Sequence, residues 1–155
     1  MHVVVSATRK CAAPREAILA FERDPWSTAR IEPRMRVSDV VVGPDGWATS
    51  WTTTAVLAKV IRMKLHTVVM AIDPVIVELR GAKQQQVSTV SVSAEPDMGG
   101  RFTLTYDVDV DLSSLWTARL QRRRFHKSAQ KAVDRLIDAA VALIEADARV
   151  PGPTA

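Results

Sequence analysis

The spacing of apolar and polar side chains divides the chain into three parts. In the first part, a run rich in β-branched residues over 2–9 predicts a strand. Apolar side chains then recur at helical spacing over 15–23, directly after a proline that suits the first turn of a helix. Pro25 ends this helix, because the residue before a proline is driven out of the helical region. A second short helix is predicted over 27–31, with Ser27 as its cap.

In the middle part the period of the pattern shortens to two. Six strands are predicted, separated by turn signals rich in Gly, Pro and Asp, over 35–42, 47–57, 62–72, 75–80, 84–94 and 101–112. The last strand alternates most regularly, with apolar residues at even positions from Phe102 to Leu112 and polar residues between them. Such alternation is typical of an antiparallel sheet that is covered on one face. The short turns also favour antiparallel pairing, since parallel strands need long crossovers.

The last part has the pattern of a long amphipathic helix that ends near Asp147. Its apolar side chains form one stripe, made of Val133, Leu136, Ile137, Ala140, Val141 and Ile144. At about 1.5 Å per residue such a helix is about 50 Å long, enough to cross a whole sheet. We expect residues 1–148 to form a single α+β domain. Residues 149–155, with two prolines and one glycine, are expected to be a flexible tail.

Composition and charge narrow the classes of function. The 155 residues are 47% hydrophobic and 25% charged, which is typical of a globular domain. The single cysteine excludes an intrachain disulfide, and the spacing of the three histidines predicts no metal site, so we expect neither a metal nor a cofactor. The net charge of +4 is mild, and no nucleic-acid module is recognisable, so no nucleic-acid partner is expected. No signal peptide or membrane-spanning run is evident, and we expect a cytoplasmic protein.

Three local motifs carry a resemblance to a known superfamily. They are the step into the first helix at 11–17 (Cys-Ala-Ala-Pro-Arg-Glu-Ala), the turn Asp-Pro-Trp at 24–26, and the strand-ending Ile-Asp-Pro at 72–74. With the order of predicted elements, they resemble the START-like or Bet v 1-like (SRPBCC) superfamily, in particular its polyketide cyclase/dehydrase-like branch. The resemblance covers residues 2–147. It implies a helix-grip fold, in which a curved antiparallel sheet wraps around the long C-terminal helix.

The same resemblance implies a cavity between sheet and helix for an apolar small molecule, such as a lipid or a polyketide. The first hypothesis is therefore a carrier or sensor of such a ligand. The second is a polyketide cyclase/aromatase-type enzyme, which would need polar side chains in the cavity; Tyr106, Arg122, Thr53 and Thr67 are candidates. The third is a protein-interaction or toxin–antitoxin-type module, which predicts a filled core and an exposed apolar patch. No catalytic residue can be named, and whether the protein is an enzyme stays open.

Candidate ligand-binding residues come from the inward strand faces, the loop after the first helix and the C-terminal helix. They are Trp26, Trp51, Met63, Leu65, Phe102, Leu104, Tyr106, Arg122, Phe125, Ala129 and Val133. The alternative for each is ordinary packing in a solid core. Trp47 is also expected to point inward, and Arg122 is expected on the core side, where it would meet an acidic ligand headgroup. His66 is expected to be exposed, because it shares a strand face with basic residues.

A run of basic residues on the C-terminal helix, between Arg119 and Lys131, suggests one further partner. It would allow peripheral contact with an anionic membrane, which would help to transfer an apolar cargo. The alternative is a helix face that is simply solvated.

Overall fold

A computed structural model describes residues 2–57, 61–82, 84–94, 100–110 and 118–149. At 56, 57, 61, 62, 94, 100–104, 106, 108–110 and 118–121 it describes the backbone alone. The elements follow the order β1 (His2–Lys10), α1 (Arg15–Arg23), α2 (Pro25–Ile31), β2 (Met35–Val42), β3 (Ala48–Leu57), β4 (Ile61–Ile72), β5 (Val75–Arg80), β6 (Gln84–Ala94), β7 (Gly100–Val110) and α3 (Ala118–Arg149).

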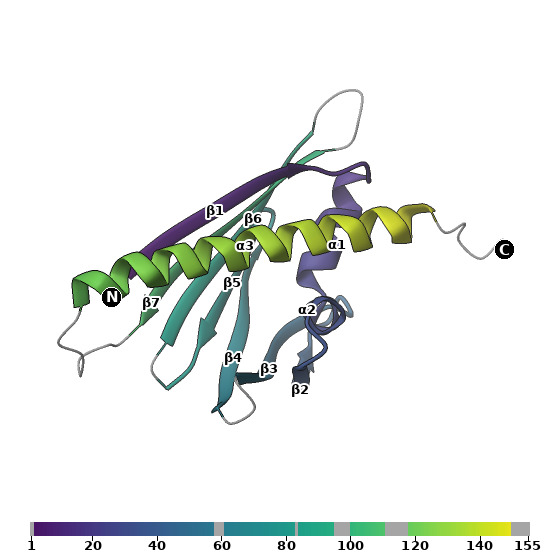
Figure 1. The fold of residues 1–155 in the computed structure, drawn as a ribbon. Helices are drawn as coiled ribbons and strands as arrows, with labels where there is room; N and C mark the ends of the chain where they lie inside the picture. Colours follow the sequence, from purple (N-terminus) through teal and green to yellow (C-terminus); the bar gives the residue numbers. More distant parts are fainter. Residues whose placement is uncertain (1, 58–60, 83, 95–99, 111–117, 150–155) are drawn as a thin grey trace, which may run out of the picture.

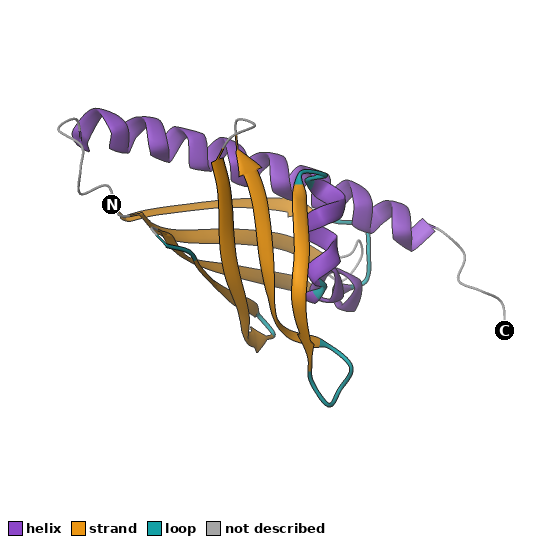
Figure 2. Cartoon of the chain, turned by 90° about the horizontal axis from the view of Figure 1, so that it is seen from below, coloured by secondary structure: helices purple, strands orange, loops and turns teal. Residues whose placement is uncertain are grey.

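The strands form one 7-stranded sheet in the order β1-β7-β6-β5-β4-β3-β2, and every neighbouring pair is antiparallel. The sheet is curved, and α3 lies along its β1 side, where it contacts β1 and β7 (Figures 1 and 2). The α+β helix-grip fold that the sequence predicted is therefore confirmed. No helix in the described part of the chain is both long enough and apolar enough to cross a bilayer.

The two short helices meet at Asp24. Its backbone ends α1, and its carboxylate accepts a hydrogen bond from the backbone N–H of Trp26 at 2.9 Å, which caps α2. Pro25 occupies the first turn, where no backbone hydrogen bond is lost. The prediction that Ser27 caps the second helix is therefore wrong: α2 starts two residues earlier, and Ser27 is buried inside it.

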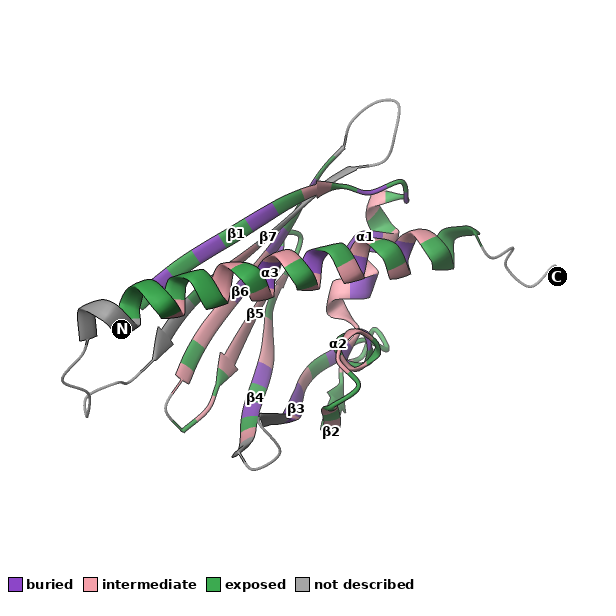
Figure 3. Ribbon diagram, in the orientation of Figure 1, coloured by how far each residue is buried: buried purple, intermediate pink, exposed green. Residues whose placement is uncertain are grey.

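The hydrophobic core lies between α3, α1 and one end of the sheet. Alternate residues of β1 are buried, and they pack with Val75 of β5 and Val90 of β6. The α3 stripe predicted from the sequence supplies the opposite wall, and buried positions recur along the helix (Figure 3). Ile137 in this stripe is fully buried. The basic side chains on the other side of α3 are exposed, as expected.

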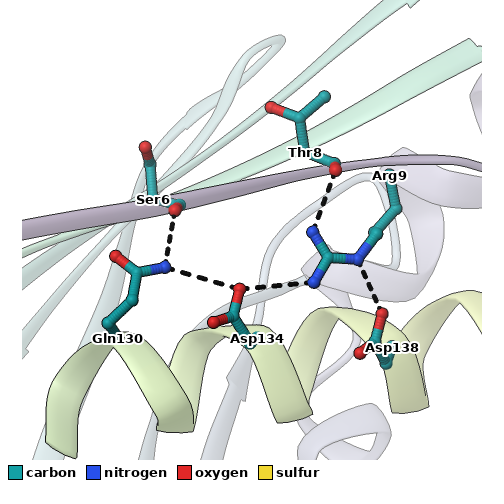
Figure 4. A network of polar contacts seen from close by, with 6 residues as sticks. All are labelled: Ser6, Thr8, Arg9, Gln130, Asp134 and Asp138. Atoms are coloured by element: carbon teal, nitrogen blue, oxygen red, sulfur yellow. Dashed lines mark hydrogen bonds and ion pairs between the residues drawn. The ribbon is translucent and has the colours of Figure 1, made fainter. Parts of the chain in front are cut away.

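Polar contacts fix α3 against β1, which is an edge strand (Figure 4). The guanidinium of Arg9 donates hydrogen bonds to the carboxylates of Asp138, at 2.7 Å, and Asp134, at 3.3 Å. The side-chain amide of Gln130 donates to the backbone carbonyl of Ser6 at 2.9 Å. An edge strand otherwise presents unpaired backbone groups, so these contacts both cover the edge and position the helix. Because α3 lies along β1, strands β2 to β4 on the opposite side of the curved sheet lie away from it (Figure 1).

Candidate functional site

A cavity of about 230 Å³ lies between the inner face of strands β3 to β6 and the helices. Its apolar wall consists of Trp51, Met63, Leu65, Val77, Leu79 and Leu136. Its polar part includes Glu22, Thr53, Thr67, Gln86 and Ser88. The cavity thus combines a large apolar surface with a smaller group of hydrogen-bonding side chains.

Strand register explains why these residues meet. Thr67 of β4 pairs with Trp51 of β3 on one side and with Leu79 of β5 on the other, and Leu79 pairs with Gln86 of β6. Directly paired residues point to the same face of a sheet, so this row forms a continuous floor. Val75 and Val90 lie on the same face, but they belong to the packed core. One face of the sheet therefore carries the core at one end and the cavity at the other.

The hydroxyl of Thr67 is the first unusual feature of the cavity. Thr67 is only 2% exposed, and its Oγ1 has no hydrogen-bond partner among the residues that the structure describes. A buried hydroxyl without a partner costs about 1–3 kcal/mol, so folded proteins rarely keep one. Thr67 borders the cavity, so this unpaired oxygen lies within its wall.

The carboxyl group of Glu22 is the second unusual feature. Glu22 follows the fully buried Ile18 by one turn of α1, so the helix directs both side chains inward. Burial raises the pKa of Glu22 from its ordinary 4.5 to about 7. Within the described part of the chain, the carboxyl has no hydrogen bond and no ion pair. Near neutral pH it is therefore part acid and part carboxylate, and it can donate or accept a proton.

A second hollow lies on the outside of the molecule, between α1, α2 and the end of α3. This groove has a volume of about 320 Å³ and includes Trp47. Its charged residues are already paired, since the guanidinium of Arg30 donates two hydrogen bonds to the carboxylate of Asp147, at 2.8 and 3.0 Å. The inner cavity, which has unpaired polar atoms, is the stronger candidate for a binding site.

Solved structures with the same arrangement of sheet and helices identify the architecture. A START superfamily protein from Mycobacterium smegmatis superposes with a TM-score of 0.75 at 18% identity, covering 94% of this chain and 99% of that one. The chain has the START-like fold. The Zhui aromatase/cyclase from Streptomyces sp. R1128 gives a TM-score of 0.73 at 14% identity, with 99% and 100% of the two chains covered.

A further solved structure with this fold is similar as well. Ara h 8.0201 gives a TM-score of 0.65 at 12% identity, with 94% of this chain and 99% of that one covered. No protein-family model and no curated protein sequence matches the chain. The START-like, polyketide cyclase-like fold that the three sequence motifs predicted is confirmed, and at these identities the likeness concerns the fold.

Three predicted ligand-binding residues line the inner cavity, namely Trp51, Met63 and Leu65. Thr53 and Thr67, named as polar candidates for the enzyme hypothesis, line it too. The side chains of Phe102, Leu104 and Tyr106 are outside the described residues; their backbones pair with β1 and β6.

The candidates on α3 lie elsewhere. Phe125 and Ala129 are partly buried against the main core, and Val133 is fully buried in it. Arg122 is exposed, so the prediction that it lies on the core side is wrong. Helical phase alone would place it there, but the described side chains of α3 that pack against the core are Phe125 and residues after it.

Both tryptophans near the short helices also differ from expectation. Trp26 is 54% exposed on α2 and does not belong to the described lining of the cavity. Trp47 precedes β3 instead of starting it, so it leaves the inward face, and the guanidinium of Arg23 stacks over its ring at 4.5 Å. His66 is exposed, as the sequence predicted.

Sequence reasoning missed Glu22, although a signal for it was present. The residue is four positions after Ile18, and residues at that spacing share one helix face. An acidic residue in line with a buried isoleucine indicates a carboxyl group that points toward the interior.

Proposed function

We propose that the protein binds a small, largely apolar molecule in the cavity between β3–β6 and the helices, as a carrier or a sensor. The observation that carries this proposal is a hollow of about 230 Å³ that borders an unpaired buried hydroxyl and an unpaired carboxyl. Protein interiors are normally close-packed, and their buried polar groups are normally paired. A ligand would fill the space and satisfy these groups at once.

The size and lining of the cavity indicate the kind of molecule. At about 30 Å³ per water, the space corresponds to roughly eight waters, slightly below the usual range for drug-sized ligands. Met35 and Met63 border it, and unbranched methionine side chains adapt to ligands of different shape. These features favour a compact ligand with an apolar body and a polar end.

Displacement of a hydrophobic fluorescent probe tests this function. Replacing Leu79 by tryptophan fills the cavity and should abolish probe binding. The matched control, Met70→Trp, adds the same side chain at an exposed position of the neighbouring strand β4 and should leave binding unchanged. Equal binding by both variants would place the probe outside the cavity and refute the proposal. Native mass spectrometry of the purified protein would identify a co-purified ligand.

A second candidate function is a cyclase/aromatase-type enzyme. Glu22, with a pKa of about 7, has the acidity that suits general acid–base catalysis near neutral pH, and the hydroxyls of Thr53 and Thr67 border the same cavity. Proton removal next to a carbonyl group is the step that such a carboxylate would perform. Incubation with a linear polycarbonyl chain should then yield a cyclised, dehydrated product, and Glu22→Gln should abolish it. An unchanged yield with that variant would exclude this role.

The third hypothesis, a protein-interaction module, required a filled core. The cavity found between sheet and helices favours ligand binding over it.

Membrane contact is a separate proposal about the outer face of α3. Arg122, Arg123, Arg124, Lys127 and Lys131 are all exposed there. A cluster of this charge attracts anionic lipid surfaces. Co-sedimentation with phosphatidylserine vesicles but not with phosphatidylcholine vesicles would support contact, and equal recovery with both would refute it.

A further inference from the structure

We propose that the molecule bound in the cavity carries a protonated amine, which pairs with the carboxylate of Glu22, so that the site prefers amphiphilic amines to alcohols and carboxylates of the same length. This inference rests on the binding function proposed above and adds the chemical class of the ligand.

The charge of the described cavity lining is the first argument. Glu22 is its only ionisable side chain; α2, α3 and the strands β2 to β6 contribute uncharged residues alone. A carboxylate ligand would add a second negative charge to a site without a described cation, which is unfavourable in a region of low polarity. An ammonium group would supply the missing opposite charge.

The cations near Glu22 in the fold are already engaged elsewhere. On α1, Arg15 pairs with Asp73, and Arg23 pairs with Asp45 at 3.5 Å, although the buried Nε of Arg23 has no hydrogen-bond partner among the described residues. On α3, Arg135 lies 3.6 Å from a carboxylate oxygen of Glu32. Burial alone raises the pKa of Glu22, and no neighbouring cation offsets it. The carboxylate is therefore left for a charge that arrives with the ligand.

The neighbouring oxygen atoms suit the same group. An ammonium carries three N–H donors. The described lining of the cavity includes the carboxyl of Glu22, Thr67 with its unpaired Oγ1, and the aromatic Trp51. Aromatic rings attract cations through their π faces. An amine can thus satisfy several unpaired groups, whereas an alcohol can donate only one hydrogen bond.

The charge proposed for the ligand headgroup is opposite to the one expected from the sequence. There, Arg122 was expected on the core side, where it would meet an acidic headgroup. Since Arg122 is exposed and Glu22 borders the cavity, the charge available to a ligand is negative.

Calorimetric titration with hexylamine, hexanol and hexanoate tests the inference, because these molecules share one chain and differ in the polar end. At about pH 8, where Glu22 is mostly ionised, hexylamine should bind at least about tenfold more tightly than hexanol, and hexanoate should bind most weakly. At about pH 6 the ionised fraction of a group with a pKa of about 7 is about tenfold smaller. The advantage of the amine should therefore fall about tenfold.

Two variants complete the test. Glu22→Gln should remove the preference for hexylamine and its pH dependence, while hexanol still binds. Glu16→Gln, an exposed position on the same helix, should retain both. If Glu22→Gln does not fold, the pH dependence of the hexylamine preference in the unaltered protein tests the inference. If hexanol or hexanoate binds as tightly as hexylamine at about pH 8, the amine inference is overturned and the binding function still stands. If none of the three ligands binds and the fluorescent probe does not bind either, the binding function itself is overturned.

Discussion

Replacement of Thr67 by valine removes a buried hydroxyl and keeps the shape of the side chain. The hydroxyl oxygen is buried without a partner in the described structure, and the residue is 2% exposed. An unpaired buried hydroxyl costs about 1–3 kcal/mol, and valine fills the same space, so no new void opposes the gain. Thr67→Val should therefore raise the free energy of unfolding by about 1 kcal/mol or more. For a domain of this size, that corresponds to an increase in Tm of about 2–4 °C.

Urea denaturation followed by circular dichroism measures this change, and the m value should stay constant. Val90→Thr is the matched control, since it inserts the same hydroxyl into the packed core on the same face of the sheet. It should lower the free energy of unfolding by about 1–3 kcal/mol. If Thr67→Val is neutral or destabilising while Val90→Thr behaves as expected, the hydroxyl of Thr67 has a partner in solution. The view that it is kept for a ligand would then be refuted.

Three further predictions concern the core, the thiol and the half-buried carboxyl group of Glu22. Ile137→Ala should lower the free energy of unfolding by about 2–5 kcal/mol in urea denaturation, because Ile137 is fully buried, whereas Lys131→Ala should change it little. Cys11 is fully buried, and this burial, together with the nearby carboxylate of Glu145, raises the pKa of its thiol to about 11. A thiol reagent should therefore label Cys11 in denaturant and not in the native state. Rapid labelling of the native protein would contradict the burial of Cys11. The raised pKa of Glu22 means that the folded state favours the protonated carboxyl. The stability gained from this protonation is complete below about pH 4.5 and is lost as the pH rises through about 7. Relative to Glu22→Gln, the unaltered protein should lose up to about 3 kcal/mol of stability over that range, and parallel pH profiles of the two proteins would show that the pKa is ordinary.

The fold could be predicted because its elements are encoded locally. β-branched residues predicted β1, and period-two patterns predicted the later strands, to within about two residues of their described ends. The stripe from Val133 to Ile144 predicted the buried side of α3. Residue patterns of this kind record burial directly, since one face of a strand or helix must be apolar. The errors at Ser27 and Trp47 arose at element ends, where a cap or turn shifts the start by one or two residues.

The position of the cavity could not be predicted in the same way. The inward positions of β5 from Val75 to Leu79 are all apolar, so the sequence does not distinguish them. Val75 nevertheless belongs to the core, and Leu79 lines the cavity. The difference depends on where α3 crosses the sheet. That position is fixed by contacts such as Arg9 with Asp138, between residues that are far apart in the sequence (Figure 4). Local patterns do not contain this information.

The polar residues of the cavity are where local rules and the observed structure disagree. A glutamate is expected at the surface, and a buried threonine hydroxyl is expected to be paired, but Glu22 is half-buried with a raised pKa and the hydroxyl of Thr67 is unpaired. Both groups cost stability in the free protein, and both border one hollow on the inner side of the sheet. Two independent costs at one place are hard to explain by packing, because leucine and valine would fit there without either cost. A bound amine that engages both groups would offset both costs. For this reason Thr67→Val should stabilise the free protein, and Glu22→Gln should remove the preference for amines.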